Sequence, residues 1–173
     1  TQVPVKTLRE FVALTKANPG KVNIGIVPNS GQHLDSLEFV RQSGANTELV
    51  PYQGGAPALR ALLANEIQLY FGAAFGLDAQ IKAGKIAPLA VSSAQRFAYV
   101  PDVPTIKEAI GIDFDSVVEY GYFTTQGTPR PVVDKLSREI AAIFTRPDVR
   151  DQVLKQGYEP RVKSADEWLA SMN

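Results

Sequence analysis

Two kinds of hydrophobic periodicity alternate over the first two-thirds of the chain. Short apolar runs bounded by turn residues, typical of buried strands, occupy residues 22–27, 67–71 and 86–91, and another ends at Val50. Between and around these runs, apolar residues recur at helical spacing at residues 7–18, 32–43, 56–63 and 77–83. Alternating strands and helices are typical of a parallel sheet covered by helices, with right-handed crossovers. The pattern therefore predicts an α/β fold.

The same spacing predicts which helical residues face the core and where helices begin. The residues expected to point inward are Leu34, Leu37 and Val40 in one helix, and Leu59, Leu62 and Leu63 in the next. Capping boxes, in which Ser or Thr is followed three residues later by Glu, begin at Thr7, Thr105 and Ser164. We expect a helix to start at each of them.

The last third of the chain has a different character. Residues 117–125 read as one more strand, and the segments after it are mostly helical. An amphipathic helix starts at Thr128-Pro129, and another runs from Pro147 to Gly157. The first of these carries an apolar stripe that includes Leu136 and Ile143.

Composition excludes several classes of function. The 173 residues contain 18 Lys and Arg and 18 Asp and Glu, so the net charge is zero and does not favour nucleic acid as a partner. There is no cysteine and only one histidine, His33, so we expect no metal site and no cofactor. No apolar run reaches the roughly 18 residues of a membrane span. We expect any signal peptide to have been removed.

The first candidate site is the turn that follows Val50. Pro51 ends the apolar run, Gly54-Gly55 forms a turn, and Ala56-Pro57 opens a helix. Such a helix start offers unpaired N–H groups and a partial positive charge, which favour a carboxylate or a phosphate. A tight turn that binds no ligand is the alternative reading.

The second candidate site is the turn after residues 22–27, which contains Asn29, Ser30 and Gly31, with Gln32 and His33 in the first turn of the next helix. Asn29 or Ser30 either caps that helix or reaches a ligand. A nucleophile–base pair of Ser30 and His33 is disfavoured because no third group is evident. In parallel sheets, ligands bind at the carboxyl ends of adjacent strands. We therefore expect residues 29–33 and 53–56 to form one site.

Three ordered motifs resemble the solute receptors of tripartite tricarboxylate transporters, the Bordetella uptake gene (Bug) family. The first is Val50-Pro51-Tyr52-Gln53-Gly54-Gly55-Ala56-Pro57-Ala58, and the second is Ala83-Gly84-Lys85-Ile86 with Leu89-Ala90-Val91. The third is Arg96 followed by Pro101-Asp102-Val103-Pro104-Thr105 and Glu108. The similarity covers nearly the whole chain.

The resemblance implies a type II periplasmic-binding fold, in which two α/β lobes close on a small carboxylate. Residues 1–122 would form the second lobe, an α/β domain whose parallel sheet is flanked by helices. Residues 123–173 would form a helical segment that belongs to the other lobe. Family members are longer, and the part matching their amino-terminal third is not in this sequence. We expect the exposed helices of the last segment to cause self-association.

The expected function is that of a periplasmic receptor without catalysis, which binds a small organic anion and delivers it to membrane transporter subunits. The expected ligand-binding residues are Asn29, Ser30, Gly31, Gln32, His33, Tyr52, Gly54, Gly55, Ala56 and Ala73. Two alternatives remain: the effector-binding domain of a transcriptional regulator, which shares this lobe architecture, and a hydrolase that uses Ser30 and His33.

Overall fold

A computed structural model describes residues 4–171. The helices are α1 (Leu8–Ala17), α2 (Gly31–Ser43), α3 (Gly55–Leu63), α4 (Ala74–Lys82), α5 (Ile106–Ile110), α6 (Arg130–Thr145), α7 (Pro147–Lys155) and α8 (Ala165–Ser171). The strands are β1 (Asn23–Ile26), β2 (Glu48–Pro51) and β3 (Leu69–Tyr70). The chain divides into an amino-terminal unit, Thr1–Val118, and a carboxy-terminal unit, Glu119–Asn173.

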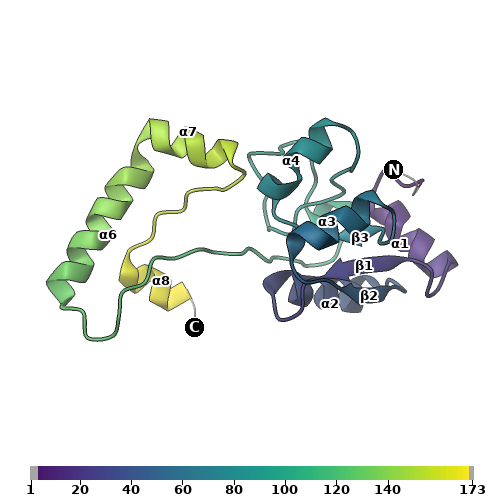
Figure 1. The fold of residues 1–173 in the computed structure, drawn as a ribbon, viewed down its shortest axis with the longest axis horizontal. Coiled ribbons are helices and arrows are strands. Elements are labelled where there is room, and N and C mark those ends of the chain that lie inside the picture. Colours follow the sequence, from purple (N-terminus) through teal and green to yellow (C-terminus); the bar gives the residue numbers. More distant parts are fainter. Residues whose placement is uncertain (1–3, 172–173) are drawn as a thin grey trace. The chain divides into compact units, whose positions relative to one another are not determined.

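The amino-terminal unit is built on a parallel sheet with strand order β2-β1-β3. Ile26 pairs with Pro51 on one side of β1, and Gly25 pairs with Tyr70 on the other side. The helices α2 and α3 connect these strands and flank the sheet (Figure 1). This confirms the prediction of an α/β fold with a parallel sheet flanked by helices.

The two faces of β1 are packed differently because successive strand residues point to opposite faces. Ile24 joins the main core cluster, together with Phe11 of α1 and Phe39 of α2. Gly25 faces the other way, and a Cβ at this position would collide with the side chain of Ile67. The buried Ile67 therefore takes the space that a side chain on β1 would need.

Capping chemistry sets the helix boundaries as predicted. The Thr7 side chain accepts from the Glu10 amide while the Glu10 carboxylate accepts from the Thr7 amide, at 3.2 Å in both cases. The same reciprocal pair is formed by Thr105 with Glu108, and by Ser164 with Glu167. All three predicted capping boxes are confirmed.

Two predicted strands are wrong. Residues 86–91 form a single bridge, between Val91 and Thr105, because Pro88 has no N–H to donate to a ladder. Residues 117–125 contain no strand, because no other segment of the described chain pairs with them. The predicted helix at residues 77–83 is present but begins earlier, at Ala74.

The predicted inward faces of α2 and α3 are partly wrong. Leu34 is 67% exposed and Leu37 is 45% exposed, whereas Ser36 and Phe39 are buried. In α3 the buried residues are Ala58 and Ala61, and Leu63 is exposed. A small residue lets the helix axis approach the sheet closely, so the buried stripe of α3 follows its alanines rather than its leucines.

The carboxy-terminal unit has no residue in α6 or α7 that is fully buried. Its contacts are mainly aromatic and ionic: the ring centroids of Phe123 and Trp168 lie 5.1 Å apart, and Arg130 pairs with Asp166 at 2.8 Å. Large apolar side chains remain exposed, namely Tyr120, Tyr122, Phe123, Val132, Leu136, Ile143, Val162 and Leu169. Within this unit the predicted apolar stripe of α6 is therefore only partly covered.

Candidate ligand site at the sheet edge

Each strand of the sheet leads through a short loop into a helix, so the N-termini of α2, α3 and α4 follow the carboxyl ends of β1, β2 and β3. Because the strands are parallel, these ends lie along one edge of the sheet. The Tyr52 amide donates to the Ile26 carbonyl at 2.8 Å, which ties the loops after β1 and β2 together. The structure therefore brings the two predicted turns to one edge, with the loop that contains Ala73.

The start of α2 is capped by Ser30. Its side chain accepts from the His33 amide at 3.3 Å and donates to the Val27 carbonyl at 2.6 Å. Asn29 precedes it with a φ of 61°, in the left-handed region that Asn tolerates. Gly31 and Gln32 complete the first turn, in which Gly31 is exposed.

This geometry favours a capping role for Ser30 over a nucleophilic one. The hydroxyl proton is directed at a backbone carbonyl, and the hydroxyl oxygen accepts a backbone N–H. The contact that links Ser30 to His33 involves the His33 amide and not its ring. A general base has to reach the proton that it removes, and here the proton is aimed at Val27.

The start of α3 has no side-chain cap. Its N-cap residue is Gly54, with a φ of 116° and a ψ of 173°, a backbone conformation that is essentially restricted to glycine. Gly55 and the exposed Ala56 form the first two helical positions. The first amides of α3 therefore lack the side-chain acceptor that Ser30 supplies in α2, and they are available to an external acceptor.

The start of α4 also has no side-chain cap, and Ala73 is its N-cap residue. Before it, the last residue of β3, Tyr70, carries a hydroxyl that the sequence prediction missed. A Cβ at Gly55 would lie 3.1 Å from this hydroxyl, so Tyr70 reaches the start of α3. Burial raises the pKa of the Tyr70 hydroxyl, which therefore stays protonated at neutral pH. The position of Tyr70 near the end of a predicted strand is the sequence signal that could have identified it as a site residue.

The three helices that follow strands differ from most others in the charge of their first turn. The first turns of α2, α3 and α4 contain no acidic residue, and neither does that of α6 in the other unit. Acidic residues stand in the first turns of α1, α5, α7 and α8, namely Glu10, Glu108, Asp148, Asp166 and Glu167. An acidic side chain offsets the partial positive charge of a helix start. At this edge of the sheet no acidic side chain of a first helical turn offsets that charge.

Tyr52 has a packing role at the same edge. Its ring lies over the sheet, where a Cβ at Gly25 would be 3.6 Å from the Tyr52 Cε2 atom. Burial, followed by the charge of Glu66, raises the pKa of the Tyr52 hydroxyl. The half-buried ring thus holds the loop that leads to Gly54.

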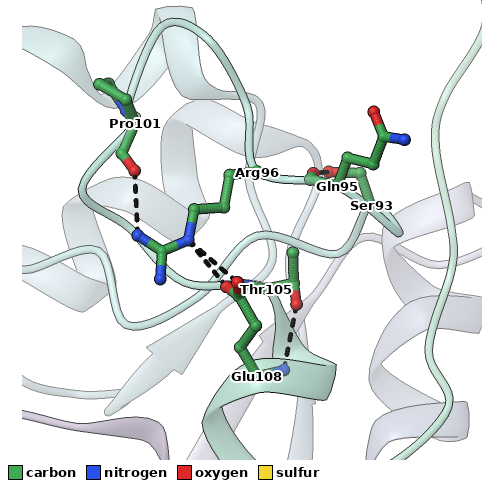
Figure 2. A network of polar contacts seen from close by, with 6 residues as sticks. All are labelled: Ser93, Gln95, Arg96, Pro101, Thr105 and Glu108. Carbon is green, nitrogen blue, oxygen red and sulfur yellow. Dashed lines mark hydrogen bonds and ion pairs between the residues drawn. The ribbon is translucent and has the colours of Figure 1, made fainter.

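The motif from Arg96 to Glu108 is a structural clip rather than a part of this edge (Figure 2). The Arg96 guanidinium pairs with the Glu108 carboxylate at 2.9 Å and donates to the Pro101 carbonyl at 3.2 Å. The same carboxylate accepts from the Thr105 amide at 2.8 Å. These contacts, first that of Thr105 and then that of Arg96, lower the pKa of Glu108. The clip joins the loop before α5 to the cap of α5.

Residues 4–171 contain no group of three or more His, Cys, Asp or Glu side chains that could hold a metal ion. None of their helices combines the length and the apolar character needed to cross a membrane.

Residues 1–170 match the family described as Tripartite tricarboxylate transporter family receptor. The chain is 33% identical over 155 residues to the UPF0065 protein in the tcbD-tcbE intergenic region of Pseudomonas sp. (strain P51), an alignment that covers 86% of this chain and 46% of that protein. It is 25% identical over 167 residues to protein BugT of Bordetella pertussis, covering 96% of this chain and 51% of BugT. The chain spans about half the length of the curated relatives it matches.

Solved structures of similar fold include ligand-bound proteins. The structure of R. palustris Rpa4515 with adipate matches with a TM-score of 0.91 and 26% identity, over 99% of this chain and 57% of that chain. MatC from Rhodopseudomonas palustris with bound malate matches with a TM-score of 0.75 and 25% identity, over 98% of this chain and 58% of that chain. These similarities confirm the predicted family resemblance and the periplasmic-binding-protein fold class.

Proposed function

Because the chain belongs to the tripartite tricarboxylate transporter receptor family, we propose that it is a periplasmic receptor without catalysis. It binds a small organic carboxylate and delivers it to the membrane subunits of a transporter of this type. The match over residues 1–170 favours this function over the effector-binding domain of a transcriptional regulator.

The observation that carries the proposal is the set of acid-free helix starts along one sheet edge. In this proposal, the amides at Gly55 and Ala56 donate to carboxylate oxygens, and the Tyr70 hydroxyl adds a neutral donor. Gly31, Gln32 and the Ser30-capped start of α2 face the remainder of the ligand, and Ala73 forms part of the wall.

The ligand class follows from the same edge and from the relatives. Rpa4515 holds adipate and MatC holds malate, so short dicarboxylates are the first candidates, with aromatic acids as the second. The edge offers backbone N–H groups and hydroxyls but no acidic side chain in the helix first turns. It therefore favours an anion and disfavours an amine.

The experiment is isothermal titration calorimetry of the chain with adipate, malate and benzoate, and with a diamine of matched length as the control. We expect heat of binding from at least one acid and none from the diamine. The recovered acid should be chemically unchanged when it is analysed by NMR. Failure of every acid to bind, or equal binding of the diamine, would contradict the proposal.

A further inference from the structure

A groove of about 310 Å³ lies on the amino-terminal unit, between α1, the end of α2 and the end of α5. Its apolar surface comes from Val12 and Ala13 of α1 and from Ile110 and Ile112. It reaches the last residue of α2, Ser43, whereas the candidate ligand site lies at the first turn of that helix. A helix of 13 residues is roughly 20 Å long, so the groove is remote from the ligand site.

The wall of the groove is a regular stripe along α1. Arg9, Val12, Ala13 and Lys16 are spaced i, i+3, i+4 and i+7, which places them on one side of the helix. The buried stripe of the same helix consists of other residues, including Leu8 and Phe11. Val12 is half-buried: it packs against the main core cluster and also lines the groove.

The two cations of this stripe have no carboxylate partner within residues 4–171. Arg9 donates to the Ala109 carbonyl, a neutral acceptor, at 3.1 Å. The amino group of Lys16 lies near Gly44, where a Cβ would be 3.6 Å away. The ion pairs of the amino-terminal unit involve neither Arg9 nor Lys16, and no acidic residue lines the groove. The Glu38 carboxylate beside it is paired with Arg41 and accepts from the groove-lining Gln42 amide at 2.6 Å. The nearby Glu10 carboxylate is used by the backbone amides of Lys6 and Thr7.

We propose that this groove docks an acidic peptide segment of a partner protein, whose apolar side chains lie on Ile110 and Ile112. Seven helical residues separate Arg9 from Lys16, a distance of roughly 10 Å along the axis. An extended peptide covers that distance in about three to four residues, and its side chains share a face only at every second residue. The matching sequence therefore has two carboxylates four residues apart, with an apolar residue midway between them on the same face. Apolar burial gives affinity, and the charge pairs give specificity.

The probe is a fluorescein-labelled peptide with the core Glu-Ser-Leu-Ser-Glu, and its counterpart has the core Lys-Ser-Leu-Ser-Lys. Fluorescence anisotropy at low salt should show at least ten-fold tighter binding of the acidic peptide, and added salt should weaken it because the cations are exposed. The double variant Arg9→Glu/Lys16→Glu should reverse the preference. The matched control Lys21→Glu/Lys85→Glu makes the same charge change at exposed sites outside the groove and should keep it.

The single variant Lys16→Glu avoids the loss of the Arg9–Ala109 hydrogen bond, and its acidic-peptide affinity should fall at least three-fold while its circular dichroism spectrum stays unchanged. Equal binding of the two peptides overturns the proposal. So does an unchanged preference in Lys16→Glu, or an equal loss in the control variant, which would reveal a net-charge effect. A chain that prefers the acidic peptide but binds no carboxylate would contradict the proposed receptor function and leave the docking groove in place.

Discussion

Replacement of Gly54 by valine should weaken carboxylate binding by roughly ten-fold to 150-fold while the fold persists. Gly54 stands at the N-cap of α3 with a φ of 116° and a ψ of 173°. No heavy atom lies within 4 Å of a Cβ built there, so an added Cβ meets no steric obstacle. The cost is therefore conformational, about 1–3 kcal/mol for a non-glycine residue in this region.

That cost is expected to appear in binding as well as in stability. To escape the unfavourable φ, the backbone around Gly54 has to rotate, and the amide of Gly55 then turns away from its bound orientation. Loss of one hydrogen bond to a charged group is worth about 1.5–3 kcal/mol, which corresponds to roughly ten-fold to 150-fold in affinity. Calorimetry with the best-bound acid measures this loss, and urea unfolding followed by circular dichroism measures the change in stability.

The matched control is Gly20→Val. Gly20 has a φ of 70° and equally open surroundings, but it precedes β1 and lies away from the loops that follow the strands. Both variants should lose stability to a similar extent, and only Gly54→Val should lose affinity. Unchanged affinity in Gly54→Val would refute the site. An equal loss in both variants would show that affinity follows global stability and not the start of α3.

Three further predictions concern other parts of the chain. His33→Ala should weaken carboxylate binding by less than about 100-fold, or about 2.7 kcal/mol, because the His33 amide and not its ring makes the contact with Ser30; a larger loss in calorimetry would make the imidazole a principal ligand. Glu108 contributes stability that is fully present above its ordinary pKa of 4.5 and is lost as the pH falls through its lowered folded pKa. The urea midpoint of Glu108→Gln should therefore change less with acidic pH than that of the parent chain. Parallel plots of midpoint against pH for the two proteins would contradict this. The exposed apolar residues of the carboxy-terminal unit, such as Leu136 and Ile143, should drive self-association, since burying each is worth roughly 1.5–3 kcal/mol. Light scattering after size-exclusion chromatography should show dimers or larger species, and the double variant Leu136→Glu/Ile143→Glu should reduce them. A monomer at all concentrations would contradict this prediction.

Local signals predicted much of the fold. Capping boxes at Thr7 and Thr105 and a glycine turn at Gly54 act within a few residues, so they can be read from sequence. Strand pairing depends on a partner elsewhere in the chain, and residues 117–125 had a strand-like composition without one. The leucines of α2 and α3 misled the core assignment because helical spacing alone does not show which side of a helix packs on the sheet, and the packed sides carry Phe39 and Ala58.

The site was predictable in outline and less so in detail. The turns around Ser30 and Gly54 were found because parallel strands place their carboxyl ends together. Tyr70 was missed because its role depends on a long-range approach to Gly55, which only the packed structure reveals. The ligand-binding roles of all these residues remain predictions for calorimetry to test.

Three helices start along the sheet edge, two without a side-chain cap and one capped by serine. This arrangement has a consequence for how the ligand specificity of such a receptor evolves. Main-chain amides are present whatever the side chain, so most substitutions in these loops leave the anchoring groups intact. Side chains next to the proposed anchor in sequence, such as Gln32 or Gln53, are then able to vary and to select a different remainder of the ligand. In a site of this kind, backbone amides bind the acidic group, and the neighbouring side chains determine which molecule that group belongs to. New specificity can therefore arise without passing through variants that have lost binding.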